Sequence, residues 1–255
     1  MTGTDFYLDS MHHPCSHVVQ LYGDDVLLLR QKVGQFIGEG LALGEPALVI
    51  AGPRNRDAFI CQLSEDGHDP IAAIRAGQLV VIDAATLLGE MMVGGKLAWA
   101  AFDLSAGAAV RALRTSTGAR RMRAYGEMVG ILWQAGRAPD AAILEDYWNR
   151  LLADGDVSLF CGYPIDLMDP ALDAEALQPL IDAHTQLLSS GPAFGSALTR
   201  AITTLIGSTP HAAGGSIPMP QAEALALWLR KAHPERAAEV LASARQYQST
   251  QLRAG

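Results

Sequence analysis

Cysteine, aromatic residues and long apolar runs are all scarce in this sequence. Only three of the 255 residues are cysteines, at positions 15, 61 and 161, and an odd, widely spaced set is not a disulfide framework. Aromatic residues make up 6% of a chain that is 49% hydrophobic, which favours helices packed on a sheet over an all-β sandwich. No apolar stretch reaches the ~20 residues that cross a bilayer, and residues 1–16 are too polar for a signal peptide. We therefore expect a cytoplasmic protein that does not associate with membranes.

Positive charge is also in deficit. The chain has 19 Lys and Arg against 27 Asp and Glu, a formal net charge of −8. Because an acidic surface repels a phosphate backbone, general nucleic-acid binding is not expected. A local exception is the arginine-rich stretch 111–123, which could contact an anion or an acidic partner, although a solvated surface is the simpler interpretation.

Short apolar runs alternate with amphipathic segments through the first two thirds of the chain. Strands are predicted at 16–21, 45–52, 78–83, 122–129 and 157–163. Helices are predicted at about 24–39, 56–66, 84–92, 99–115 and 140–153. Apolar runs without polar alternation are typical of strands buried on both faces. The predicted fold is therefore α/β, a mostly parallel sheet with helices on both faces.

The character of the sequence changes after Pro164. Prolines punctuate helical segments, residues 209–220 read as a Gly/Pro-rich linker, and a helical pattern over 221–248 is interrupted by Pro234. The predicted organisation is a flexible tail, an α/β domain and a helical C-terminal extension, with bounds 1–15, 16–168 and 169–255.

The turn from Ala51 to Asp57 lies where a phosphate-binding loop would lie, between a buried strand and a helix. Such a loop needs several glycines, a lysine and a Ser or Thr for magnesium. Here only Gly52 is present, no Gly-Lys-Ser/Thr follows, and Asp57 would repel phosphate. ATP hydrolysis is therefore not expected. Arg54 and Arg56 could still hold one anion at the helix N-terminus, or could be plain surface arginines.

Close to the N-terminus, imidazole and thiol groups are crowded into a few residues. His12, His13, Cys15 and His17 are residue types that bind zinc, nickel or copper. Their spacing matches no closed structural zinc pattern, and most of them precede the first strand. We expect no bound metal and no cofactor, and keep these four as weak candidates.

Further candidate residues lie at a strand end, on a helix face and inside a strand. Glu127 ends a predicted strand, where open α/β sheets bind ligands, although a salt bridge is the simpler interpretation. Glu145, Trp148 and Asn149 share one helix face, and Trp148 is more typical of a core than of a pocket. Cys161, central in a buried strand, is more typical of a small core residue than of a reactive thiol. No catalytic triad, nucleophile elbow or zinc-protease motif is present, so we do not expect an enzyme.

Taken together and in order, several segments resemble the MEDS family, a sensory domain first noted in regulators of methanogens and methylotrophs. They lie at 17–25, 39–53, 82–88, 124–133 and 144–164. The resemblance covers roughly residues 16–168 and leaves out the C-terminal third.

This resemblance implies a fold related to RecA/KaiC-type ATPases with a decayed phosphate-binding loop. It also implies an input domain for small organic molecules, of a kind often joined to DNA-binding or histidine-kinase modules. Five residues match recurrent family positions, and with Arg54 they form the predicted ligand site: His17, Tyr22, Glu127, Trp148 and Cys161. No kinase or helix-turn-helix segment is recognised in this sequence, so the output is expected to pass through another protein or the C-terminal helices.

Three functions stay open at this point. The first is a signal-transduction module that binds a small organic ligand or a signalling partner without hydrolysing nucleotides. The second is an interaction module that regulates a histidine kinase or transcription regulator with no small ligand. The third is a degenerate nucleotide-binding protein. Homodimerisation through the apolar C-terminal helices is a further open alternative.

Overall fold

The protein is built on a six-stranded parallel sheet. The computed structural model describes residues 16–153, 155–207 and 216–254. The strands follow the spatial order β3-β2-β6-β7-β1-β8, and every neighbouring pair runs parallel. Their bounds are β1 His17–Leu21, β2 Ala47–Ala51, β3 Leu79–Asp83, β6 Met122–Gly126, β7 Val157–Tyr163 and β8 Gln186–Leu187. The predicted parallel α/β fold is thereby confirmed.

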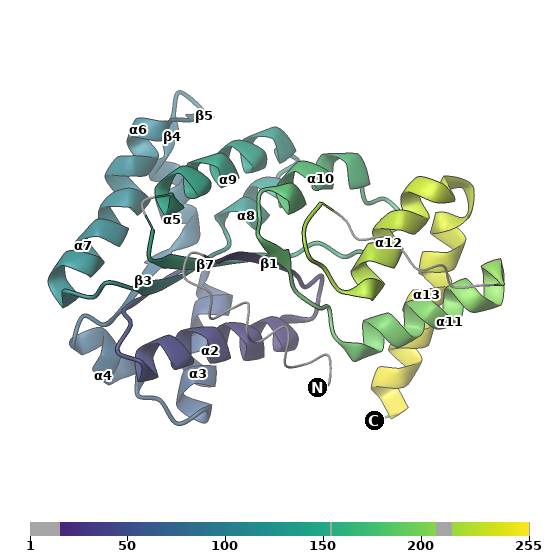
Figure 1. The fold of residues 1–255 in the computed structure, drawn as a ribbon, viewed down its shortest axis with the longest axis horizontal. Helices are drawn as coiled ribbons and strands as arrows, with labels where there is room; N and C mark the ends of the chain where they lie inside the picture. Colours follow the sequence, from purple (N-terminus) through teal and green to yellow (C-terminus); the bar gives the residue numbers. More distant parts are fainter. Residues whose placement is uncertain (1–15, 154, 208–215, 255) are drawn as a thin grey trace.

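Helices cover both faces of this sheet (Figure 1). One face packs on α2 (Val26–Ala42) and α3 (Pro53–Glu65), with α4 (Pro70–Arg75) beside them. The other face carries α5 (Ala84–Glu90), α8 (Met128–Gln134), α9 (Ala138–Leu152) and α10 (Ala174–Asp182). Between α5 and β6 lie the hairpin β4 (Met92–Val93) and β5 (Lys96–Leu97), then α6 (Trp99–Phe102), the π-helical turn η1 (Asp103–Gly107) and α7 (Ala108–Thr117).

Strand alternation decides which side chains meet each helical layer. Val18 joins the core beneath α2, whereas its neighbours Val19 and Leu21 join the core beneath α9. His17 points to the same face of β1 as Val19, because side chains two residues apart share a face. In β7, Cys161 and Tyr163 lie on that face too, because they pair with Val19 and Leu21. The α9 face of β1 and β7 therefore gathers one polar set among apolar neighbours.

One predicted strand is wrong in its second half. Residues 122–129 were expected to be extended, but β6 ends at Gly126 and α8 begins at Met128, with Glu127 as its N-terminal cap residue. Met128, Val129 and Leu132 are buried on one helical face, so helical packing decides this segment.

The C-terminal third contributes to the sheet as well as to the helices. Strand β8 pairs with β1 at Val18↔Gln186, so the segment after residue 168 adds an edge strand to the sheet before its helices. Because β8 has two residues, its sequence pattern is too short to be recognised. Three helices follow, α11 (Pro192–Ile206), α12 (Gln221–Ala232) and α13 (Pro234–Ala254), and the predicted break at Pro234 is confirmed.

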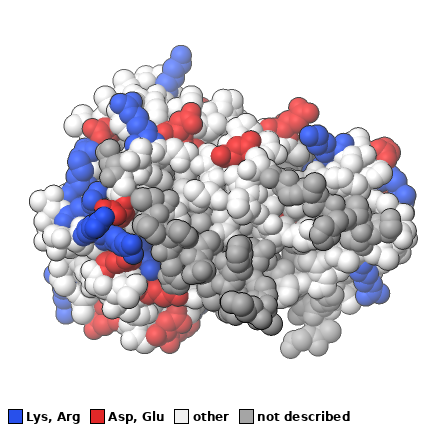
Figure 2. Space-filling model, in the orientation of Figure 1, with Lys and Arg blue, Asp and Glu red and all other residues white. Residues whose placement is uncertain are grey.

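The arginine-rich stretch is only partly a solvated surface. Lys and Arg gather at the α7 end of the face in Figure 2, with acidic side chains beside them. Arg111 and Arg120 pair with Asp103 and Asp156 at 2.6 and 3.3 Å, but Arg123 is buried. Among the described residues, no helix combines the length and apolarity of a membrane span.

Candidate functional site

The junction of β2 and α3 holds a carboxylate at the helix N-terminus. Glu127 Oε1 accepts a hydrogen bond from the Gly52 backbone N–H, and Asn55 Nδ2 donates to Oε2 at 2.7 Å. The Tyr125 hydroxyl also donates to Oε2, at 3.3 Å. These contacts form because β2 and β6 are neighbours in the sheet, so their carboxyl ends meet. The side chain thus fills the position that an anion would take at the start of α3.

Tyr22 and Arg54 lie beside this carboxylate. Burial and the negative charge of Glu127 raise the pKa of the Tyr22 phenol. A hydrogen bond with Asn55 and the positive charge of Arg54 lower this pKa by less. Burial likewise raises the pKa of the Glu127 carboxyl, although the hydrogen bonds from Asn55 and Gly52 oppose this shift. Arg54 itself is exposed.

A cavity of about 480 Å³ opens at the carboxyl ends of β1 and β7, next to Tyr22. We call it the edge cavity. Its walls come from the loop after β1 and the first turn of α2, the loop after β7, and helices α11 and α13. They comprise residues 21–25, Leu27, Leu28, residues 165–167, Ser190, Phe194, Arg245, Gln248 and Ser249. A second hollow of about 390 Å³ shares Asp24, Asp166 and Arg245 with it.

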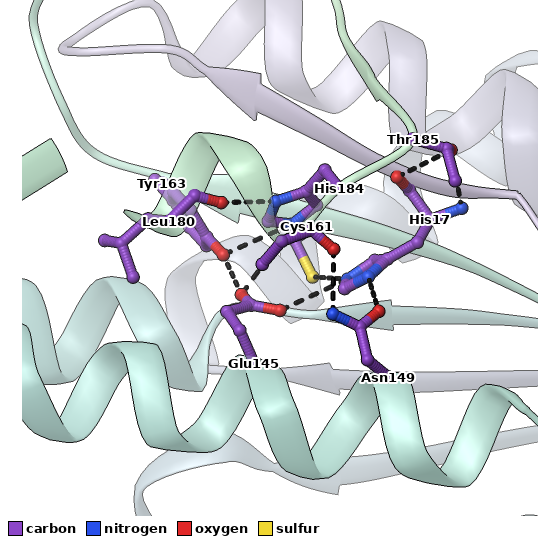
Figure 3. A network of polar contacts seen from close by, with 9 residues as sticks. His17, Glu145, Asn149, Cys161, Tyr163, Leu180, His184 and Thr185 are labelled. Carbon is purple, nitrogen blue, oxygen red and sulfur yellow. Dashed lines mark hydrogen bonds and ion pairs between the residues drawn. The ribbon is translucent and has the colours of Figure 1, made fainter. Parts of the chain in front are cut away.

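A separate cluster of polar side chains is buried between the sheet and α9 (Figure 3). His17 from β1, Glu145 from α9, Cys161 from β7 and His184 just before β8 meet there, and we call these four residues the His17 cluster. His17 Nε2 lies 3.4 Å from Cys161 Sγ and 3.2 Å from Glu145 Oε2. His184 Nε2 lies 3.7 Å from Glu145 Oε1, and the two imidazole centroids are 4.1 Å apart.

Neighbouring groups fix the orientation of these side chains. Asn149 Nδ2 donates to the Ala183 carbonyl at 2.8 Å, which turns Asn149 Oδ1 toward His17 Nδ1 at 2.9 Å. His184 Nδ1 lies 2.6 Å from the Leu180 carbonyl. The Tyr163 hydroxyl donates to Glu145 Oε1. Glu145 Oε2 is buried and faces His17 Nε2.

Burial dominates the electrostatics of this cluster. It raises the pKa of the Glu145 carboxyl, opposed by the hydrogen bond and charge of His17. It holds the pKa of the Cys161 thiol well above its usual value, and that of the His184 imidazole well below. Each of these shifts favours the neutral form of the group.

Comparison with known proteins now decides the family. The family model described as MEDS, the MEthanogen/methylotroph, DcmR Sensory domain, matches residues 16–185. The chain belongs to the MEDS family. No curated protein matches it. The match extends past the expected boundary at 168, and the MEDS region so defined includes Glu127, the whole His17 cluster and most of the sheet.

The six predicted site residues of this MEDS chain fall into three places. Tyr22, Arg54 and Glu127 lie together at the carboxyl edge, and the edge cavity touches only Tyr22. His17 and Cys161 lie in the His17 cluster. Their role in binding a ligand stays a prediction.

Trp148 lies apart from both places. It is fully buried, and its ring contacts Phe102 edge-on at a centroid distance of 5.1 Å. Trp148 is therefore part of the hydrophobic core. Of the weak metal candidates, only His17 can be placed, because His12, His13 and Cys15 lie outside the described residues.

Sequence reasoning found part of the His17 cluster. The shared face of Glu145 and Asn149 was recognised from helical spacing. His184 and Tyr163 were missed, because a lone histidine before a two-residue strand and a tyrosine at the end of a buried strand carry no local pattern. Only the pairing of β1 with β7 and β8 brings them together.

Proposed function

We propose that this MEDS chain is a regulatory module that binds a small organic ligand in the edge cavity. Binding changes how the C-terminal helices are held, and the chain hydrolyses no nucleotide. A sensory role follows from membership of a sensory domain family.

The observation that carries the proposal is the origin of the cavity walls. Tyr22 and Asp166 belong to the loops at the carboxyl ends of β1 and β7, whereas Arg245 and Ser249 belong to α13. Open α/β sheets bind ligands at the carboxyl ends of their strands. A ligand here would touch the sheet and the last helix at once.

The lining favours a small ligand with both an apolar and a polar part. Leu27, Leu28 and Phe194 supply apolar surface, and the side chain of Leu27 is 59% exposed. Asp24 and Asp25 supply acceptors, while Arg245 Nη2 bonds to Asp166 Oδ2 at 2.5 Å. Apolar walls with a few convergent polar groups are typical of small-molecule sites.

The occupied start of α3 supports a role without nucleotide hydrolysis. The Glu127 carboxylate already accepts hydrogen bonds from the Gly52 N–H and the Asn55 amide. These are the donors that would face a phosphate. A phosphate would have to displace this carboxylate and would meet its negative charge at close range.

Two contacts give the signal a physical route. The Arg245–Asp166 ion pair lies in the cavity wall, and Arg230 of α12 donates to the Leu167 carbonyl at 2.9 Å. A ligand that binds one arrangement of these contacts more tightly makes that arrangement of the C-terminal helices more populated. The difference between its affinities for the two arrangements sets the size of the shift. The output partner is a histidine kinase or a transcription regulator, as the resemblance implies.

A thermal-shift screen against small organic molecules and nucleotides tests this proposal, with hits measured by calorimetry. Leu27→Trp should fill the cavity and weaken binding of a hit at least tenfold. Leu104→Trp is the matched control, because Leu104 is 77% exposed on η1 and does not line the cavity. Flat responses throughout, or hits that both variants bind equally well, would contradict the proposal.

A further inference from the structure

The ligand atoms of the His17 cluster converge on one point. One atom each of His17, Glu145, Cys161 and His184 can be chosen so that all four lie within 4.8 Å of one another, and all four residues are buried. We propose that these four side chains form a closed, tetrahedral site for one zinc ion. This site lies in the sheet core, apart from the edge cavity, and does not depend on the proposed ligand.

The orientation of the two imidazoles is the first argument. His17 Nδ1 faces the Asn149 amide oxygen and His184 Nδ1 faces the Leu180 carbonyl, so both rings turn Nε2 into the cluster. These two Nε2 atoms face the Glu145 carboxyl group at 3.2 and 3.7 Å.

The carboxyl group of Glu145 lies at the centre of the cluster. The Tyr163 hydroxyl donates to its Oε1, and His17 Nε2 lies 3.2 Å from its Oε2. A cation at the convergence point would compensate the charge of this buried carboxylate and bind both Nε2 atoms at the same time.

The distances fit a tetrahedral ion. Zinc bonds of roughly 2.0–2.3 Å place neighbouring tetrahedral ligand atoms about 3.3–3.6 Å apart. The separations of His17 Nε2 from Cys161 Sγ and Glu145 Oε2 are 3.4 and 3.2 Å, and His184 Nε2 lies 3.7 Å from the other carboxyl oxygen, Oε1. Small side-chain rotations within the cluster would complete the shell.

The ligand types select the metal. Two imidazoles and a thiolate suit zinc, whereas magnesium and calcium require oxygen ligands. Four protein ligands leave no open position, which is typical of a structural rather than a catalytic zinc. The carbonyl and amide partners behind both imidazoles are the outer contacts that orient metal-binding histidines.

The position of the site explains what the ion would do. It would join β1, from the start of the described chain, to three later parts: α9, β7 and the segment that leads into β8. Metal binding would therefore stabilise the far side of the sheet and fix the start of the C-terminal segment.

Cobalt in place of zinc tests the proposal, because a cysteine thiolate bound to Co²⁺ gives a near-ultraviolet charge-transfer band. The full chain with Cys15→Ser and Cys61→Ser keeps Cys161 as its only thiol. Produced in zinc-poor medium with added cobalt, it should contain one metal ion per chain and show this band together with tetrahedral visible bands. The wild-type chain should likewise contain one zinc per chain after purification.

Two controls separate this site from the histidine-rich N-terminus. His12→Gln with His13→Gln should leave the metal content and the band unchanged. Adding Cys161→Ser to the two-serine chain should abolish the band, and metal content should fall at least tenfold. A folded two-serine chain that lacks the thiolate band, or holds well under one metal ion per chain, would overturn the proposal. Metal lost with the N-terminal histidines instead would overturn it equally.

Discussion

Arg123 places its guanidinium in the interior of the protein, beside the start of β6. Its Nε donates to Glu45 Oε2 at 2.9 Å and its Nη1 donates to the Phe36 carbonyl at 2.6 Å. Glu39 Oε2 lies 3.3 Å from Nη1. The stem fits because Gly40 has no side chain, since a Cβ there would come within 2.6 Å of Arg123 Cδ. A buried charge of this kind is held by its partners, and removing it takes a compensating positive charge away from two carboxylates.

We expect Arg123→Ala to lower the free energy of unfolding by about 3 kcal/mol, toward the lower end of the range for broken buried pairs because both glutamates keep some contact with water. Urea denaturation followed by circular dichroism measures this change. Arg120→Ala is the control, because its exposed pair with Asp156 should contribute less than about 1 kcal/mol. Equal losses in the two variants would show that Arg123 has no special structural role.

Single residues were harder to interpret from the sequence than the elements that carry them. For the stretch that holds Arg123 the sequence predicts either a solvated surface or contact with an anion or acidic partner, because the charge pattern carries no information on the glutamates of a distant helix and strand. Cys161 was treated as a small core residue, and its burial agrees, yet its contact with His17 spans 144 positions. Such contacts follow from strand register, which a single sequence does not display.

At the scale of elements, apolar runs and helical spacing were reliable wherever they were long. Strand β7 has the predicted bounds, and α9 differs by two residues at its start and one at its end. The errors lie where an element is short or a junction is apolar, as in β8 and at the β6–α8 junction around Glu127.

Besides its apolar face, α12 carries an arginine that binds the loop after β7. Arg230 donates to the carbonyls of Leu167, Asp169 and Leu172 at 2.9, 2.5 and 3.3 Å. Hydrogen bonds from a charged group contribute about 2 kcal/mol. Arg230→Ala should therefore raise local opening of α12 and α13 roughly 30-fold.

Hydrogen exchange of the amides in α12 and α13 measures this opening, with the amides of β2 and β7 as an internal reference that should stay unchanged. Arg236→Ala in α13 is the control, because its 3.8 Å pair with Glu239 is exposed and weak. Uniformly faster exchange across sheet and helices would mean that the C-terminal helices do not open on their own.

At the scale of the whole molecule, one hydrophobic core runs from the sheet into the C-terminal helices. Buried residues of α11, α12 and α13 belong to the same cluster as Val19, Leu159 and Trp148. The sequence predicted the parallel sheet and the terminal helices as two units. Their shared core, and the edge cavity between them, depend on packing that no local pattern describes.

The central claim is that a ligand in the edge cavity acts on the sheet edge and on α13 together. Hydrogen exchange of the full chain, with and without a saturating amount of the tightest-binding small organic molecule from the screen, tests it most directly. We predict slower exchange in the loop after β1 and in α13, with α4 and α7 unchanged. Slower exchange that leaves both the β1 loop and α13 untouched would contradict the claim.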